Sequence, residues 1–126
     1  MPFVRIDVLE GRPRAQLAAL GDAVHRALVE AIGIPEADRF QVITPHPAGT
    51  LVYDRGYLGI GRTDAVVFVQ ITLSAGRTLE QKKALYAAIV RYLSGAGVLA
   101  EDVFVSLVEV TKENWSFGNG VAQYAT

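Results

Sequence analysis

The sequence predicts an α+β fold built from two consecutive β-α-β units, with one four-stranded sheet and two helices on one face of it. Three observations predict this fold: two long segments with apolar residues at helical spacing, strand-like segments on both sides of each, and a match between the two halves of the chain. Within each unit the right-handed crossover makes the two strands parallel and places the helix against the sheet.

The first half of the chain has the order strand, helix, strand. Residues 2–8 alternate between apolar and polar side chains, and this period of two indicates a strand with two distinct faces. A stripe of apolar residues at helical spacing then predicts a helix, which Gly33 and Pro35 end. The elements expected in this half are a strand at 2–8, a helix at 14–32, a short strand at 40–44 and a small strand at 51–53.

The second half repeats this order. Its first strand is rich in β-branched and aromatic residues, which predicts a position inside the sheet. Thr78 and Gln81 have the spacing of a capping box at a helix start, and Asn119-Gly120 predicts a tight hairpin turn near the end of the chain. The elements expected in this half are a strand at 65–73, a helix between Thr78 and Gly95, a strand at 103–110 and a short return strand at 121–124.

The two halves also match residue by residue, which predicts an internal repeat. The matched pairs include Gly11 and Gly76, Arg12 and Arg77, Leu20 and Leu85, Asp38 and Asp102, and Phe40 and Phe104. We predict a single domain over 1–126, with repeat units at 2–45 and 65–110 and a C-terminal hairpin at 111–126. Helices on one face leave the other face of an apolar sheet uncovered, so we also expect the chain to form an oligomer.

Composition limits the classes of function. The net charge is −1 and no basic cluster stands out, which argues against binding nucleic acid through its phosphates. There is no cysteine, and the two histidines are too scattered to predict a metal site. The N-terminus lacks the pattern of a signal peptide, and no apolar run is long enough to cross a membrane. We expect a soluble, cytoplasmic protein with no metal, nucleic-acid or membrane partner.

The most informative position for chemistry is Pro2. If Met1 is removed, Pro2 becomes the chain terminus, and its secondary amine is fixed at the start of a strand. A terminal α-amine has a pKa of about 8; burial lowers that pKa and gives a neutral base, whereas a nearby carboxylate raises it and gives a cationic acid. Either form is useful near neutral pH. The alternative is purely structural, because proline is well tolerated as the first residue of a strand.

Two charged residues and an aromatic cluster are further candidates. Arg77 stands between a buried strand and a helix start, where a guanidinium suits a carboxylate; the alternative is a surface arginine in a turn. Asp38 is placed to orient an amine or a water, although its match with Asp102 favours a structural role in a turn. The aromatic residues near the C-terminus suit a pocket wall, the core or a subunit interface. They are Trp115, Phe117 and Tyr124.

Taken together, these features resemble the tautomerase superfamily, and within it the malonate semialdehyde decarboxylases. The resemblance covers essentially the whole chain and implies a homotrimer with sites between subunits, a small carboxylate substrate and no cofactor. The reaction it implies is the loss of carbon dioxide from malonate semialdehyde or a related short 3-oxo acid. The segments that carry it are Met1-Pro2, Asp38-Arg39-Phe40, the loop at 57–62, Gly76-Arg77-Thr78 and Trp115-Ser116-Phe117-Gly118.

The resemblance also implies a role for each candidate residue. Pro2 would be a cation that polarises the substrate aldehyde or forms an iminium with it, and Asp38 would orient that amine. Arg77 would hold the substrate carboxylate. The apolar wall beside the carboxylate would comprise Trp115, Phe117 and Tyr124.

One position departs from many relatives in that superfamily. They have a second arginine where this chain has Ala75, so Arg12 or Arg39 is a candidate substitute. Two other functions stay open. The first is a keto–enol tautomerase or a hydratase of unsaturated acids, which needs a neutral Pro2 amine. The second is a non-catalytic trimer that binds a small carboxylate or serves as an interaction module, which a retained Met1 would favour.

Overall fold

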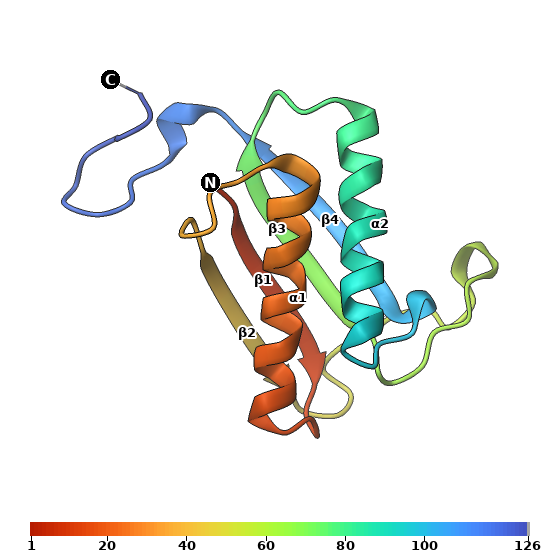
Figure 1. Ribbon diagram of the computed structural model, residues 1–126. Coiled ribbons are helices and arrows are strands. Elements are labelled where there is room, and N and C mark those ends of the chain that lie inside the picture. The colour runs from red at the N-terminus through yellow and green to blue at the C-terminus, as the bar shows by residue number, and fades with distance from the viewer. Residues whose placement is uncertain (126) are drawn as a thin grey trace.

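The computed structural model describes residues 1–125 and consists of a four-stranded sheet with two long helices against it (Figure 1). In chain order the elements are β1 (Phe3–Leu9), α1 (Arg14–Ile32), β2 (Phe40–His46), η1 (Tyr57–Gly59), β3 (Val67–Ser74), α2 (Leu79–Gly95), η2 (Ala100–Asp102), β4 (Val103–Val110) and η3 (Lys112–Asn114), where η marks a short 3₁₀ helix. The predicted order of the long elements is confirmed. Among the described residues, no helix combines the length and apolarity that crossing a membrane requires.

The strands have the order β2-β1-β3-β4 across the sheet. β1 pairs in parallel with β2, β3 pairs in parallel with β4, and the two units join through the antiparallel pair of β1 with β3. The helices α1 and α2 lie side by side on one face of the sheet (Figure 1). The predicted α+β class with tandem β-α-β units is thus confirmed. Because β1 and β3 are antiparallel, the start of β1 lies at the same end of the sheet as the end of β3.

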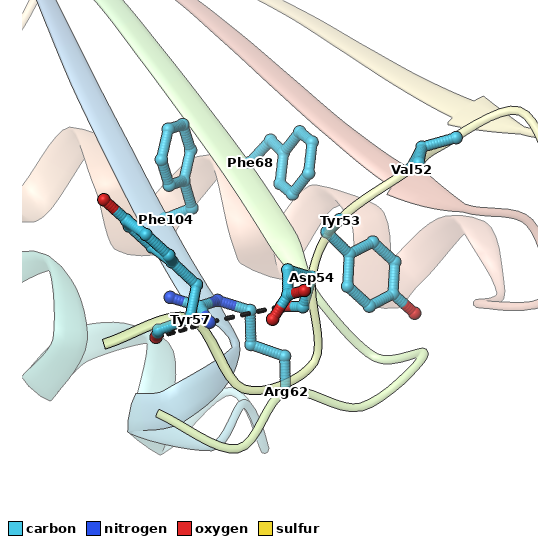
Figure 2. Close-up of a pocket in the computed structure, with 7 residues that line it drawn as sticks. All are labelled: Val52, Tyr53, Asp54, Tyr57, Arg62, Phe68 and Phe104. Carbon is cyan, nitrogen blue, oxygen red and sulfur yellow. Dashed lines mark hydrogen bonds between the residues drawn. The ribbon is translucent and has the colours of Figure 1, made fainter. Parts of the chain in front are cut away.

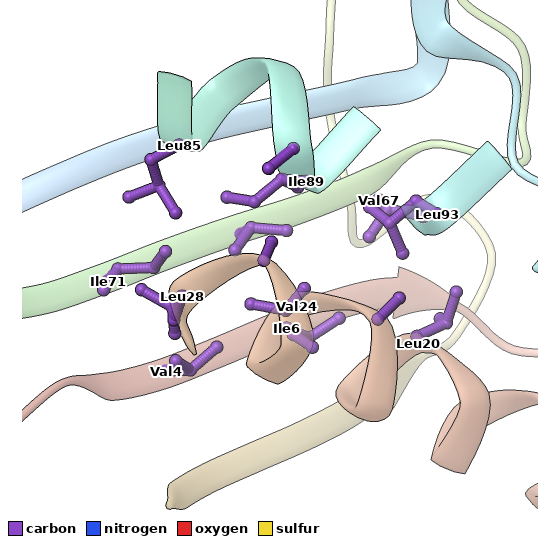
Figure 3. Packing of buried hydrophobic residues seen from close by; sticks show 14 of the residues in the cluster. Val4, Ile6, Leu20, Val24, Leu28, Val67, Ile71, Leu85, Ile89 and Leu93 are labelled. Carbon is purple, nitrogen blue, oxygen red and sulfur yellow. The ribbon is translucent and has the colours of Figure 1, made fainter. Parts of the chain in front are cut away.

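The core lies between this sheet and the two helices (Figure 3). Inward residues alternate with outward ones along β1 and β3, and burying each large apolar side chain contributes about 1.5–3 kcal/mol. A slip of one residue would turn these side chains outward, so the core fixes the register of the strands. Fully buried members of the core include Val4, Ile6, Leu20, Val24, Leu28, Val67, Ile71, Leu85, Ile89 and Leu93.

The ends of the helices follow the sequence signals. Gly33 ends α1 in the left-handed region, with a φ of 67°. The predicted capping box of α2 is present: Gln81 N donates to Thr78 Oγ1 at 3.2 Å, and Thr78 N donates to Gln81 Oε1 at 2.9 Å. This cap fixes the turn that carries Arg77 directly before the helix.

The helix α1 passes close to β2 at Gly21, where an added side chain would displace the ends of two β2 side chains. A Cβ atom on Gly21 would lie 2.7 Å from Gln41 Oε1 and 2.9 Å from Ile43 Cδ1. We expect Gly21→Ala to lower the free energy of unfolding by about 1–3 kcal/mol, because the overpacking outweighs the higher helix propensity of alanine.

Gly95→Ala, at the end of α2, is the matched control. Nothing lies within 4 Å of that Cβ position, so its free energy of unfolding should stay equal or rise by up to about 1 kcal/mol. Denaturant unfolding of both variants checks this, and equal stability of the two would contradict it.

The strand predicted at 51–53 is wrong: this segment forms no strand. It belongs to a loop that side chains close onto itself. Tyr53 donates its hydroxyl hydrogen to Asp64 Oδ1 at 2.5 Å, and Arg55 forms an ion pair with the same carboxylate. Arg62 Nη1 donates to three backbone carbonyls within the loop. These bonds satisfy the polar groups of the loop internally, and the segment 51–53 joins no strand ladder.

The C-terminal hairpin expected at 111–126 has its turn but no return strand at 121–124. Asn119 and Gly120 both have positive φ, at 62° and 68°, as a tight Asn-Gly turn requires. Hydrogen bonds of the Gln123 side chain take the place of a strand ladder. Phe117 N donates to Gln123 Oε1, and Gln123 Nε2 donates to the carbonyl of Gly118, each at 2.9 Å. The last residue of the expected hairpin lies outside the described residues.

Candidate active site

The start of β1 places the chain terminus beside Asp38. β1 and β2 run parallel with Phe3 opposite Phe40, and continuing this register places Met1 opposite Asp38. The terminal ammonium of Met1 forms an ion pair with the Asp38 carboxylate, whose side chain is only 9% exposed. The backbone N–H of Asp38 donates to the Pro35 carbonyl at 3.0 Å. Asp38 therefore combines the turn position expected from the repeat with an amine partner for its side chain.

On the other side of Met1 lies Ser74, the last residue of β3. β1 and β3 run antiparallel with Phe3 opposite Thr72, and continuing this register places Met1 opposite Ser74. The Ser74 hydroxyl donates to Met1 Sδ at 2.9 Å. Asp38, Met1 and Ser74 thus form one row across three neighbouring chain segments, with Met1 in the middle.

Ser74 joins parts of the site that lie far apart in the sequence. Its Oγ accepts a hydrogen bond from Trp115 Nε1 at 3.1 Å, and its backbone carbonyl accepts one from Arg77 Nη1 at 3.0 Å. The residue is buried, with 3% of its surface exposed. Ser74 was not among the residues predicted from the sequence. The signal that identifies it is its position opposite Met1, which depends on the antiparallel pairing of the two units.

Arg77 lies in the turn between β3 and α2, with a half-buried side chain. Within residues 1–125 its guanidinium forms no ion pair. Glu109 lies near it: the pKa of Glu109 is lowered mainly by the hydrogen bond from Lys82, and the charge of Arg77 makes a smaller contribution. A guanidinium has five N–H donors, and one bond to a carbonyl leaves donors for an anionic ligand.

Aromatic side chains form a wall beside this row. Trp115 and Phe117 stack with ring centroids 5.7 Å apart and an interplanar angle of 12°. Phe117 also contacts Phe40 at 5.7 Å and Tyr124 at 4.8 Å. A hollow of about 250 Å³ lies between Phe3, Phe40 and the segment Trp115–Phe117. Tyr124 contacts Phe117 and is 39% exposed, so it lies at the rim of the cluster.

The structure therefore brings the candidate residues to one end of the sheet. Pro2 is buried and directly follows Met1. Met1 itself lies between Asp38 and Ser74. Arg77 and Trp115 are both tied to Ser74. Within the described residues, no group of three or more His, Cys, Asp or Glu side chains is arranged to hold a metal ion.

Arg12 and Arg39, the candidate substitutes for the arginine that many relatives have at position 75, lie elsewhere in this chain. Arg39 Nη2 forms an ion pair with Asp22 Oδ1 at 2.7 Å, on the outer side of α1. Arg12 follows the far end of β1 and donates to the carbonyl of Ala65 at 2.7 Å. Burial lowers the pKa of Arg12. Within one chain, neither guanidinium reaches the row at Met1.

A related hollow lies at the starts of β3 and β4, at the opposite end of the sheet from the start of β1. Figure 2 shows the residues that line it. Phe68 and Phe104 line it with ring centroids 5.4 Å apart, and they are the repeat counterparts of Phe3 and Phe40. Its volume is about 270 Å³. The rest of its lining comes from the loop before β3, namely Val52, Tyr53, Asp54, Tyr57 and Arg62.

Asp102 is the repeat counterpart of Asp38, and no chain terminus lies beside it. It is 1% exposed, and its carboxylate accepts hydrogen bonds from Thr63 N and Thr63 Oγ1, both at 2.7 Å. The counterpart of Pro2 is Val67, the first residue of β3, whose nitrogen is a peptide amide. The two ends therefore share a carboxylate and aromatic walls, but the second has no group suited to amine chemistry.

Comparison with known proteins gives a consistent picture along the sequence. A family profile described as "Tautomerase enzyme" matches residues 38–118, and a second profile with the same description matches residues 2–55. The chain is 45% identical over 124 residues to "Probable tautomerase YusQ" of Bacillus subtilis (strain 168), covering 98% of each protein. It is 37% identical over 127 residues to "Probable tautomerase YrdN" of the same strain, covering 100% of this chain and 98% of that protein.

Solved structures agree with the fold. The FG41 malonate semialdehyde decarboxylase inhibited by 3-bromopropiolate is 43% identical with a TM-score of 0.93, over 97% of this chain and 93% of that chain. A second malonate semialdehyde decarboxylase, solved to explain its decarboxylase and hydratase activities, is 38% identical with a TM-score of 0.91, over 97% and 95%. A fused 4-OT described as a symmetric trimer is 30% identical with a TM-score of 0.79, over 98% of each chain.

Proposed function

The chain belongs to the tautomerase family, and from this premise we propose that it decarboxylates malonate semialdehyde, or a related short 3-oxo acid, once Met1 has been removed. The proposed acid is the secondary amine of Pro2, and no cofactor takes part. The proposal is supported by the likeness to two solved malonate semialdehyde decarboxylases over 97% of this chain. It is also supported by the grouping of Pro2, Asp38 and Arg77 at one end of the sheet.

The observation that carries the proposal is the ion pair between the chain terminus and Asp38. Only Cα and the carbonyl carbon of Met1 separate its nitrogen from that of Pro2, so the two nitrogens are roughly 3–4 Å apart. Removal of Met1 would leave a secondary amine close to the same carboxylate. A neighbouring carboxylate favours the protonated form of an amine, and the Pro2 amine would therefore act as a cationic acid.

In the proposed reaction, the cationic Pro2 amine donates a hydrogen bond to the aldehyde oxygen while Arg77 binds the carboxylate. The bond between the carboxylate carbon and its neighbour breaks, and the electron pair moves toward the carbonyl group. The resulting enolate is stabilised by the adjacent cation. Carbon dioxide leaves, and the enolate takes up a proton from solvent at carbon to give acetaldehyde, so the Pro2 amine stays protonated. Asp38 holds the amine in its protonated state and orients it.

The aromatic wall has a role in the same reaction. Trp115 and Phe117 present stacked rings beside Ser74 and the row at Met1. A carboxylate is poorly solvated next to apolar surface. An apolar wall therefore favours conversion of the carboxylate into neutral carbon dioxide.

A second candidate is keto–enol tautomerisation, or hydration of small unsaturated acids, in the same pocket. The two Bacillus subtilis relatives described as probable tautomerases favour it. This chemistry needs a neutral Pro2 amine that acts as a base. The Asp38 carboxylate opposes that neutral form, so decarboxylation is the reaction that the geometry supports better.

The working form proposed here is a homotrimer. The sheet face away from the helices carries apolar side chains that are exposed in the single chain, among them Phe40, Val42, Phe104 and Val108. Apolar surface of this kind marks an interaction site. A fused 4-OT of similar fold is a symmetric trimer. Light scattering should give a particle of three 13.6 kDa chains, and a monomer in solution would contradict the proposal.

The test of the proposed function is the release of carbon dioxide from malonate semialdehyde by the chain that begins at Pro2. Pro2→Ala should lower kcat/KM by at least about 10²-fold, because the placed acid is altered. Pro47→Ala, in the exposed loop after β2, is the matched control and should leave turnover unchanged. Turnover that persists in both Pro2→Ala and Arg77→Ala would overturn the proposal.

A further inference from the structure

We infer that the hydroxyl of Ser74 donates a hydrogen bond to the substrate carboxylate, beside Arg77, in the space that Met1 leaves. The inference deepens the proposed function and rests on it in taking the ligand to be a small carboxylic acid. It makes Ser74 a substrate-binding residue. The end of β3 then has a second hydrogen-bond donor for the carboxylate besides Arg77. The neighbouring side chain, Ala75, has no donor.

The space in question is defined by the row of Asp38, Met1 and Ser74. Neighbouring strands lie about 4.7–4.9 Å apart, so the Cα atoms of Asp38 and Ser74 are separated by roughly 9–10 Å. Loss of Met1 opens a gap one residue wide between these two side chains, with the Pro2 nitrogen at its base. A short 3-oxo acid is smaller than a methionine residue, and the gap therefore has room for it.

The direction of the Ser74 hydrogen is fixed by its partners. Trp115 Nε1 is a donor only, so the Ser74 oxygen must accept at 3.1 Å and its own hydrogen must point elsewhere. At present that hydrogen points to Met1 Sδ at 2.9 Å, and a thioether sulfur is a weak acceptor. When Met1 leaves, a buried O–H donor faces the gap without a protein partner. Leaving such a donor unpaired is unfavourable, which makes the gap selective for a ligand with an oxygen acceptor on that side.

Charge decides which end of the substrate lies against Ser74. The opposite wall of the gap is the Asp38 carboxylate, which repels a second carboxylate. The Arg77 guanidinium is tied to the backbone carbonyl of Ser74 at 3.0 Å, so the positive charge is on the Ser74 side. The substrate carboxylate therefore lies against Ser74 and Arg77, and the aldehyde lies toward the amine of Pro2.

The test measures binding of propionate to the chain that begins at Pro2, by ligand-observed NMR. Ser74→Ala should raise the Kd of propionate about tenfold or more, as expected for loss of a hydrogen bond to a charged group. It should change the Kd of propionamide, which lacks the charge, by a smaller factor. Ser94→Ala is the matched control: Ser94 is an exposed serine near the end of α2, on the helical side of the molecule. Its Kd for propionate should equal that of the wild type.

Two further variants separate direct contact from support of Trp115. Trp115→Phe removes the hydrogen bond that Trp115 Nε1 donates to Ser74 Oγ but keeps the Ser74 hydroxyl. It should raise the Kd of propionate less than about threefold. Ser74→Cys keeps the shape of the side chain but has a weaker donor. Its Kd for propionate should lie between those of the wild type and Ser74→Ala. Equal losses in Trp115→Phe and Ser74→Ala, or no loss in a folded Ser74→Ala, would overturn the inference.

This readout does not depend on turnover. If the wild type binds propionate through Ser74 but releases no carbon dioxide from malonate semialdehyde, the proposed function fails and the inference about Ser74 stands. If carbon dioxide is released and Ser74→Ala binds propionate as tightly as the wild type, the inference fails alone.

Discussion

A chain that keeps Met1 is expected to release no measurable carbon dioxide from malonate semialdehyde, a loss of at least about 10³-fold relative to the chain that begins at Pro2. Two physical reasons act together. The Pro2 nitrogen is then an amide, which has no titratable proton and cannot act as an acid. The Met1 residue also fills the row between Asp38 and Ser74, where its ammonium pairs with the carboxylate and its sulfur accepts from the hydroxyl.

The Met1-containing form can be prepared with a cleavable leader whose removal leaves Met1 as the first residue. Intact mass spectrometry identifies each form, and a methionine aminopeptidase then converts one into the other. Turnover should appear in step with the loss of Met1. Equal turnover before and after cleavage would contradict the role of the Pro2 amine, and Met1 retained in the natively expressed chain would favour a non-catalytic binding protein.

Arg77→Ala should lower kcat/KM by about 10²–10³-fold, equivalent to about 3–4 kcal/mol of transition-state stabilisation. The guanidinium donates to the backbone carbonyl of Ser74, and within residues 1–125 it forms no ion pair. Without it, the substrate carboxylate faces Asp38 without a balancing charge. Arg77→Lys should lose less, because it keeps the charge but not the paired donors of the guanidinium.

Arg91→Ala is the matched control for that experiment. Arg91 is an exposed arginine of α2 that pairs with Glu30 of α1, on the helical side of the molecule. Its removal should leave kcat/KM unchanged, since it lies away from the row at Met1. Thermal unfolding of both alanine variants checks that the fold is intact. Unchanged kcat/KM in a folded Arg77→Ala would show that another group binds the carboxylate.

The sequence was sufficient to predict the order of the elements and the parallel pairing within each unit, because independent signals agreed. Helical spacing of apolar residues, the Thr78 capping box and the matched glycines all pointed to two β-α-β units, and the core confirms them. The repeat also isolated Pro2, because only the first unit has a chain terminus at its strand start. Asp38 illustrates the limit of this reasoning. Its match with Asp102 indicated a shared structural role, yet the two carboxylates bind different partners: a chain terminus in one case and Thr63 in the other.

Ser74 could not be predicted from the sequence. Its position opposite Met1 depends on the antiparallel pairing of β1 with β3, and a repeat does not determine how its two units face each other. The two missing strands have a different cause. At 51–53 and 121–124, side-chain hydrogen bonds to Asp64 and from Gln123 close the segments locally. Residue patterns that predict strands do not report such competing bonds.

The most direct test of the catalytic account is the pKa of the Pro2 amine, measured by NMR titration of the Met1-free chain with ¹⁵N-labelled proline. A carboxylate beside an amine favours its protonated form, so we expect this pKa to lie above about 8, the ordinary value of an α-amine, and to fall in Asp38→Asn. That result would mean a cationic acid at neutral pH, as decarboxylation requires. A pKa well below about 8 in the wild-type chain would contradict the account and would favour a neutral base and tautomerisation.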